Sequence, residues 1–286
     1  MRWAGLRGTG FVLLVQSVRA LLPLLAFFGL VLSATAREIP FDFVDGYILV
    51  HASVHAQPVT LILDSGASVS VLSLEAAKRL HLARGEAVAI DGVNASAFAY
   101  AIEPVTAMAS GVGMGEIGMA IDLSRAGQLC SRHVDGLIGA GFFDGRITQI
   151  DYERHRIRLL DAAPSGGESL RLLARSGVYC VPVSVNGSHP RWTRLDTGCN
   201  DELHWVVRRG SAAPAHEDAS IGFITNTEDE TVVPVRLGHI LLPHVAATLH
   251  GTAIFPGEAG LLGSGILSQY RVTVDAIGGR IFLGQE

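Results

Sequence analysis

The stretch Leu63-Asp64-Ser65-Gly66-Ala67 occurs a second time, slightly varied, as Leu195-Asp196-Thr197-Gly198-Cys199. Each copy follows an apolar, strand-like run, so each aspartate is predicted to stand at the end of a β-strand. Two matched acidic loops in one chain suggest one shared site. Two carboxylates that lie close together cannot both stay ionised, so one holds a proton while the other acts as a base.

The duplication extends beyond these loops. Tyr47 and Tyr179 are 132 positions apart, the same offset as the two loops, since 179−47 and 196−64 both give 132. Farther on, Asp135-Gly-Leu-Ile-Gly-Ala-Gly141 matches Ala259-Gly-Leu-Leu-Gly-Ser-Gly265 at an offset of 265−141, or 124. One unit of roughly 120 to 130 residues therefore occurs twice, and the loops absorb the difference in length.

These residues resemble those of a known family. Asp-Ser/Thr-Gly followed by an apolar-apolar-Gly element, here Leu137-Ile138-Gly139 and Leu261-Leu262-Gly263, is similar to the aspartic peptidases, in a single-chain arrangement with retroviral-protease-like or pepsin-like lobes. The resemblance covers nearly all of residues 39–284. It implies an all-β, bilobal aspartic-protease fold, in which two homologous barrel-like lobes enclose a catalytic cleft. Such a chain is expected to act as a monomer.

The resemblance also implies roles for the matched residues. Asp64 and Asp196 would be the catalytic pair, which activates a water molecule by general acid and base catalysis to hydrolyse a peptide bond. Neither a metal nor another cofactor is needed. The hydroxyls of two loop residues would cross-link the loops beneath the pair, the loop glycines would allow tight turns, and two further glycines would pack behind the loops. These supporting residues are Ser65, Gly66, Thr197, Gly198, Gly139 and Gly263.

Two features depart from the pepsin pattern. Ala67 and Cys199 stand where the pepsin branch commonly carries a hydroxyl that hydrogen-bonds an aspartate, so we expect activity at mildly acidic to neutral pH. The flap that closes over a bound peptide is placed at residues 91–100 of the first lobe and 221–227 of the second. Tyr100 is then either a flap aromatic or a surface strand tyrosine.

The composition fits a folded, exported enzyme. Hydrophobic residues make up 49% of the chain and charged residues 17%, which indicates a core-forming protein. The net charge of −5 makes nucleic acid an unexpected partner, whereas the resemblance implies a peptide or unfolded protein substrate. One lysine against 21 arginines points to a GC-rich, bacterial source.

Residues 1–36 are predicted to be a signal peptide. Arginines precede an apolar stretch over residues 21–32, and Ala34-Thr35-Ala36 supplies small residues for cleavage after Ala36. The alternative is an uncleaved anchor, although Arg19 and Pro23 interrupt the apolar run. We expect a periplasmic or secreted protein without membrane contact after cleavage. The first lobe would span residues 37–162, the linker 163–168 and the second lobe 169–286.

The expected secondary structure is mostly strand. Residues 47–54 and 59–63 form a hairpin with Gln57-Pro58 between its strands, and each lobe ends in a further hairpin, over 147–160 and 271–283. Residues 73–82 are predicted to form a helix with Ser73 as its N-cap. A shorter helix is predicted over residues 202–208.

Several patterns have competing interpretations. Gly113-Met-Gly115-Glu-Ile-Gly118 fits a dinucleotide-binding motif, but no βαβ unit surrounds it, so we interpret it as a glycine-rich loop. His51 and His55 would share one face of a strand, and a metal site there is disfavoured. Cys180 and Cys199 are the candidate pair for one disulfide. Besides a peptidase, we considered a catalytically silent peptide-binding protein with the same fold and a nucleotide-dependent enzyme.

Overall fold

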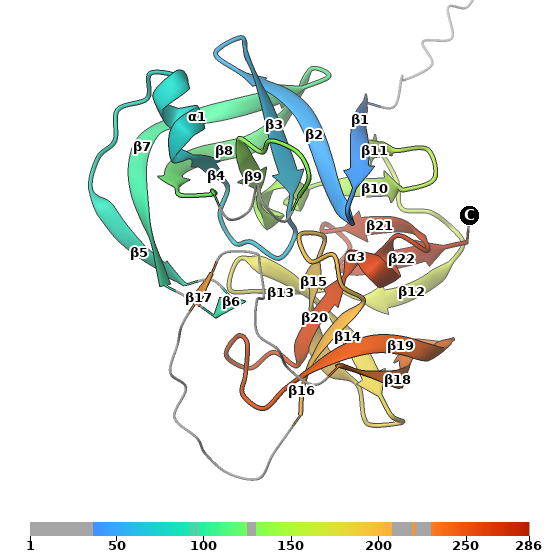
Figure 1. Ribbon diagram of the computed structural model, residues 1–286. Coiled ribbons are helices and arrows are strands. Elements are labelled where there is room, and N and C mark those ends of the chain that lie inside the picture. The colour runs from blue at the N-terminus through green and yellow to red at the C-terminus, as the bar shows by residue number, and fades with distance from the viewer. Residues whose placement is uncertain are drawn as a thin grey trace, which may run out of the picture. The chain divides into compact units, whose positions relative to one another are not determined.

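The computed structural model describes residues 37–91, 93–94, 96–124, 130–207, 219–220 and 230–285, and the predicted signal peptide and the 221–227 flap lie outside them. Regular structure in the described part is almost entirely β, as predicted (Figure 1). None of the described helices is long and apolar enough to cross a membrane.

The first lobe is a closed barrel of six strands. Strand β2 hydrogen-bonds to β3 on one side, and its pairing with β7, through Ser53 and Met108, closes the ring. In spatial order the strands are β2 (Tyr47–Val54), β3 (Gln57–Leu63), β9 (Gly136–Ile138), β4 (Val71–Ser73), β8 (Val112–Ile121) and β7 (Ser96–Ala109).

The second lobe repeats this barrel. Its strands follow the same spatial order as their counterparts in the first lobe, and pairing of the first with the last again closes the ring. They are β14 (Val178–Val185), β15 (Arg191–Asp196), β20 (Gly260–Gly263), β16 (Leu203–Val206), β19 (Ile240–His250) and β18 (Glu230–Leu237). The duplication in the sequence is thus a duplication of the barrel.

Six further strands form a sheet to which both lobes contribute. At its centre β10 pairs antiparallel with β21, from Ile147 opposite Asp275 to Ile150 opposite Val272. The order across the sheet is β1 (Arg37–Val44), β11 (Arg156–Leu160), β10 (Ile147–Asp151), β21 (Arg271–Asp275), β22 (Arg280–Gly284) and β12 (Glu168–Arg171). The two hairpins predicted at the ends of the lobes therefore meet and join the lobes.

The remaining elements are short. Helix α1 (Leu74–Arg79) begins after Ser73, whose hydroxyl accepts a hydrogen bond from Ala76 N–H (2.9 Å), as predicted for an N-cap. The helix ends before residue 82 because His81 adopts a left-handed backbone with φ 59°. The others are the 3₁₀ helix η1 (Ala140–Phe143), α3 (Ser264–Leu267), β5 (Ala87–Asp91), β6 (Val93–Asn94), β13 (Leu173–Arg175) and β17 (Ala219–Ser220).

Three local predictions were wrong. The helix predicted over residues 202–208 is strand β16, because its buried residues 203–206 pair with both β19 and β20. The glycine-rich loop at Gly113–Gly118 lies within β8, which pairs with β7 through irregular register. The first hairpin turns at His55 and Ala56, both at positive φ, while Gln57 and Pro58 already belong to β3.

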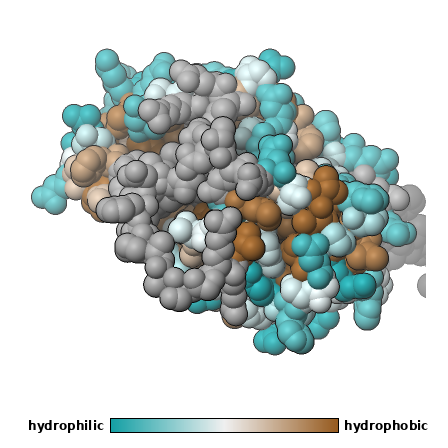
Figure 2. All heavy atoms as spheres, turned by 60° about the horizontal axis from the view of Figure 1, so that its bottom comes forward, coloured by the Kyte–Doolittle hydropathy of each residue, from teal (hydrophilic) through white to brown (hydrophobic). Residues whose placement is uncertain are grey.

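Most large apolar side chains are buried in the barrels and beneath the shared sheet. Some remain at the surface, where Figure 2 shows hydrophobic areas among hydrophilic side chains. Among the residues that the structure describes, the most exposed large apolar side chains are those of Ile277, Phe98, Val232 and Leu241.

Candidate active site

Both aspartates stand where a strand ends beside a parallel neighbour. Strand β3 runs parallel to β9 up to Leu63, and β15 runs parallel to β20 up to Asp196. Each chain leaves its barrel at this point in a tight loop. The fold therefore presents Asp64 and Asp196 from matched positions in the two lobes.

Four hydrogen bonds tie the loops together. Ser65 N–H donates to Thr197 Oγ1 (2.9 Å), and Thr197 N–H donates to Ser65 Oγ (3.0 Å). Ser65 Oγ also donates to the carbonyl of Leu195 (2.8 Å). Thr197 Oγ1 donates to the carbonyl of Leu63 (2.7 Å). All of these groups are buried, so the network holds the loops at a fixed separation.

The loop glycines let each carboxylate approach the opposite backbone. A Cβ atom on Gly66 would collide with the Asp196 carboxylate, and one on Gly198 would collide with that of Asp64. Gly66 N–H donates to Asp64 Oδ1 (2.9 Å), and Gly198 N–H donates to Asp196 Oδ1 (3.0 Å). No larger residue fits either position without moving the carboxylates.

Burial and mutual repulsion act on the two carboxyl groups. Asp64 and Asp196 are only 5% and 7% exposed. Burial raises the pKa of both, and the charge of Asp64 raises that of Asp196 further. Two carboxylates held this close cannot both stay ionised. The pair is thus suited to hold one proton and one negative charge.

Gly139 and Gly263 lie directly behind the loops. A Cβ atom on Gly139 would lie 2.6 Å from the Ala67 carbonyl oxygen, and one on Gly263 would lie 2.9 Å from that of Cys199. The next residues bond the same carbonyls, since Ala140 N–H reaches Ala67 at 2.8 Å and Ser264 N–H reaches Cys199 at 2.7 Å. The glycines permit this close packing.

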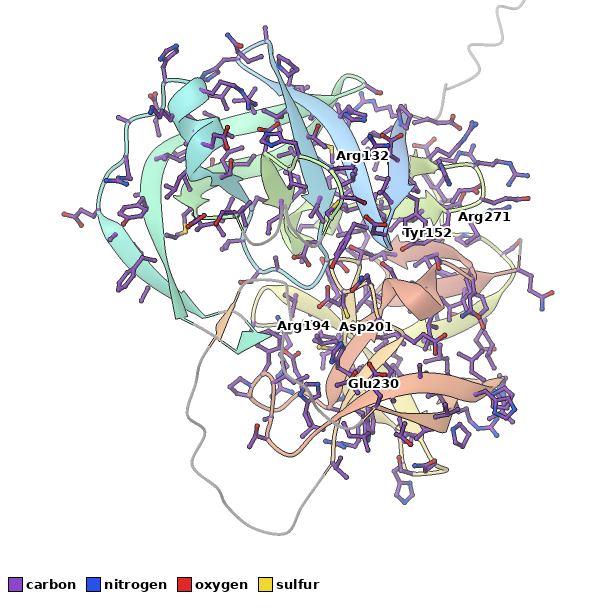
Figure 3. All side chains as sticks on the ribbon, viewed as in Figure 1. Arg132, Tyr152, Arg194, Asp201, Glu230 and Arg271 are labelled. Carbon is purple, nitrogen blue, oxygen red and sulfur yellow. The ribbon has the colours of Figure 1, made fainter. Side chains whose placement is uncertain are left out.

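A buried ion pair behind the second loop was not predicted from the sequence. Arg194 Nε and Nη2 each lie 2.8 Å from a carboxylate oxygen of Glu258, and Nη1 donates to the carbonyl of Gly66 in the other lobe (2.8 Å). Figure 3 labels Arg194. Its positive charge opposes the rise in pKa of both aspartates.

The first lobe lacks this pair. At the same offsets, 194−132 and 258−124, it carries Ile62 and Val134, which pack in an apolar cluster. Comparison of the repeats was the signal that could have found Arg194, because a charged residue replaces an apolar one within a buried strand.

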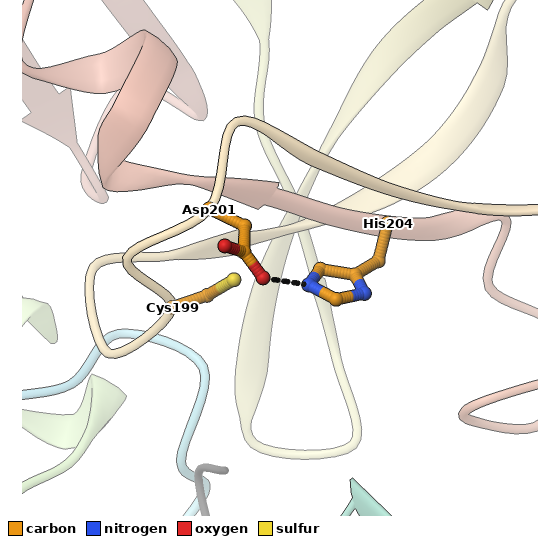
Figure 4. A group of neighbouring side chains, drawn as sticks. All are labelled: Cys199, Asp201 and His204. Carbon is orange, nitrogen blue, oxygen red and sulfur yellow. Dashed lines mark hydrogen bonds and ion pairs between the residues drawn. The ribbon is translucent and has the colours of Figure 1, made fainter. Parts of the chain in front are cut away.

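Polar side chains also gather after the second loop. Asp201 Oδ2 lies 2.8 Å from His204 Nε2, and His204 Nδ1 lies 2.9 Å from His250 Nε2. The hydrogen bond with His204 lowers the pKa of Asp201, and burial lowers the pKa of His250 to about 4. Cys199 is buried beside this group (Figure 4).

The predicted disulfide is absent from the structure. Cys130, Cys180 and Cys199 are all free and buried. Cys180 lies opposite Arg194 within the β14–β15 pair, whereas Cys199 lies in the loop beyond the end of β15. Burial raises the pKa of both thiols.

The first-lobe flap candidate, residues 91–100, covers the tip of the hairpin formed by β5 and β7. At this tip β6 pairs with β17 of the second lobe, Asn94 opposite Ala219 and Val93 opposite Ser220. Tyr100 lies farther down, within β7, with the Arg84 guanidinium 4.4 Å from its ring centre.

A cavity of about 390 Å³ adjoins the Asp64 loop. Its lining comes from the segment after the loop, from β8 and from η1, and comprises Ser68, Val69, Ser70, Gly115, Glu116, Gly118, Met119 and Gly141.

Comparison with known families gives one match. Residues 50–117 match the family model described as aspartyl protease. The match begins in β2, includes the Asp64 loop and ends in β8, so it supports an aspartyl-protease relationship through the first lobe. No curated protein matches the chain. The match does not extend into the second lobe, which repeats the barrel of the first.

Proposed function

We propose that the protein is an exported, two-lobed aspartic endopeptidase. The observation that carries the proposal is the juxtaposition of Asp64 and Asp196 on matched loops, each carboxylate packed against the glycine of the opposite loop. The match of residues 50–117 to the aspartyl-protease model supports the same reaction class.

The proposed mechanism uses one carboxylate as a base and the other as an acid. The ionised group takes a proton from a water held between Asp64 and Asp196, and this water attacks the scissile carbonyl carbon. The protonated group donates a hydrogen bond, and then its proton, as charge develops on the substrate. Collapse of the tetrahedral intermediate, with proton transfer to the amine, releases two peptides.

The remaining loop residues position the pair. The Ser65 and Thr197 network keeps the carboxylates at a fixed separation, and the backbone N–H groups of Gly66 and Gly198 favour an ionised oxygen on either side. Rigid placement lowers the reorganisation that the reaction needs.

Export is proposed from the sequence of residues 1–36. N-terminal sequencing of the protein recovered from its native compartment should find Arg37 as the first residue. A mature chain that still carries residues 1–36 would indicate an anchor instead. Size-exclusion chromatography should show a monomer, because one chain supplies both aspartates.

The decisive experiment is cleavage of an unfolded protein substrate from pH 3 to 8 by the wild type, Asp64→Asn and Asp196→Asn. We expect each substitution to lower the rate by about 10²–10⁴-fold, with unchanged circular dichroism. A folded wild type that binds the substrate without cleaving it would favour the alternative, a silent peptide-binding protein. Cleavage that persists in both variants would assign the reaction to other residues.

A further inference from the structure

Three side chains of different chemistry converge just after the Asp196 loop. Cys199 and Asp201 lie in the loop that follows β15, and His204 lies in β16. The thiol sulfur, a carboxylate oxygen and a ring nitrogen lie within 4.8 Å of one another. Figure 4 shows all three pointing to one place.

The fold does not require these residues. At the offset of 132, the first lobe carries Ala67, Val69 and Leu72 in their places, and it forms the same barrel. Three positions that are apolar in the first lobe therefore carry polar or metal-ligating side chains in the second. Because the changed positions converge on one point, a shared ligand explains them better than three separate structural roles.

The donor set indicates the class of ligand. A thiolate, an imidazole and a carboxylate are the groups that bind Zn²⁺ and similar divalent cations, and three protein ligands leave a fourth position for water. Harder cations such as Mg²⁺ and Ca²⁺ prefer oxygen ligands alone. Cys199 and His204 are both buried, while Asp201 is open to solvent, which gives a cation a route of entry.

The second ring nitrogen of His204 also has a hydrogen-bonding partner. His204 presents Nε2 to Asp201 and Nδ1 to His250 Nε2, at 2.9 Å. A metal-bound histidine typically donates its other N–H group to such a partner, which fixes the ring. With a cation on Nε2, the His204 proton resides on Nδ1 and is donated to His250.

We propose that Cys199, Asp201 and His204 form a binding site for one Zn²⁺-class divalent cation, with His250 orienting His204. Binding forms bonds from the cation to sulfur, oxygen and Nε2, and the thiol proton of Cys199 passes to solvent. The site is separate from the proposed peptide hydrolysis, which uses only Asp64 and Asp196. By joining the loop to β16, a bound cation would fix the segment that follows Asp196.

The test is metal binding by the purified protein after treatment with a chelator. Titration with Co²⁺ should produce the near-ultraviolet charge-transfer band of a cobalt–thiolate bond, and calorimetry with Zn²⁺ should give one cation per chain. Zn²⁺ should also raise the melting temperature. None of these readouts depends on peptidase activity.

The first lobe supplies matched variants. Cys199→Ala, Asp201→Val and His204→Leu each install the residue of the other lobe, so the barrel is expected to tolerate them. Cys199→Ala should abolish the cobalt–thiolate band, and His204→Leu should abolish stoichiometric Zn²⁺ binding. His250→Gln should weaken binding by about 10–100-fold. The controls Cys130→Ala and Cys180→Ala should bind as the wild type does.

A folded wild type without a cobalt–thiolate band would overturn the proposal and leave Asp201, His204 and His250 as a hydrogen-bonded chain. This test uses only the wild-type protein, so it does not depend on whether any variant folds. A band that persists in folded Cys199→Ala would equally overturn it, because the sulfur ligand would then be another cysteine.

Discussion

Because of Arg194 and Glu258, the two aspartate loops have different surroundings. These two residues form a buried ion pair in the second lobe, close to Asp64 and Asp196, whereas the first lobe carries Ile62 and Val134 at the matching positions. Arg194→Ile alone should destabilise the protein by about 3–5 kcal/mol, because it leaves the Glu258 charge buried without a partner. Equilibrium unfolding in denaturant measures this loss.

The double variant Arg194→Ile/Glu258→Val separates stability from catalysis. It recreates the apolar pair of the first lobe, so most of the lost stability should return. The pH profile of cleavage should nevertheless move to higher pH, because removing a positive charge raises the pKa of a neighbouring carboxyl group. An unchanged profile in the folded double variant would show that Arg194 acts only through packing.

Among the elements, helix α1 and strand β3 share one buried anchor, Asp135. Its Oδ1 lies 2.8 Å from Arg79 Nη1, and its Oδ2 accepts a hydrogen bond from Thr60 N–H (2.9 Å). Burial alone would raise the Asp135 pKa, but these bonds, together with one between His133 Nε2 and Oδ1 (3.0 Å), outweigh it and lower the pKa overall. The matching residue in the second lobe is Ala259.

Asp135→Asn should therefore lower the free energy of unfolding by about 1.5–3 kcal/mol near neutral pH, the usual contribution of hydrogen bonds to a charged group. Because the pKa is lower in the folded state, this contribution is present above the pKa of the unfolded chain and is lost as the pH falls through the folded value. The difference in unfolding free energy between wild type and variant should shrink accordingly in acid. Asp42→Asn, at an exposed pair with His51, is the control and should change stability by about 0–1 kcal/mol. An equal effect from both substitutions would contradict the role of burial.

The sequence predicted those elements whose pattern is local. Alternating and β-branched runs gave the strands of β2, β10, β11 and β21, and a serine before an apolar face gave the N-cap of α1. The errors occurred where distant partners decide the structure. Residues 203–206 form a strand because β19 and β20 flank them, and neither neighbour is visible in a short window of sequence.

Some residues of the candidate site could likewise be predicted from the sequence, whereas others could not. The two acidic loops could be found because they repeat, and the structure brings their carboxylates together. Comparison of the repeats could have singled out Arg194, but Glu258 is 64 positions away, so their pairing becomes apparent only in three dimensions. The cluster of Cys199, Asp201 and His204 lies within six residues, but its spacing matches no established metal motif, so only its convergence in space reveals it.

At the scale of the whole described chain, the pairing of Asp64 with Asp196 depends on how firmly the lobes are held together. The loops contribute four buried hydrogen bonds. The shared sheet adds the β10–β21 ladder, in which the buried Gln149 side chain also donates to Thr273 Oγ1 (3.1 Å). The covalent connection between the lobes is the exposed segment before β12. The shared sheet already fixes the position of one lobe relative to the other. We therefore expect the covalent link to add little to how firmly the two lobes are held together.

Cutting that segment should therefore leave the site intact. A protease site inserted between Pro164 and Ser165 allows the purified protein to be nicked, and we expect both fragments to elute together and to cleave substrate at the rate of the intact chain. Thr273→Lys tests the role of the shared sheet. It buries a charge at the centre of the β10–β21 pairing and should let the nicked halves separate. Separation of the fragments without this substitution would show that the linker, rather than the shared sheet, holds Asp64 and Asp196 in reach of one another.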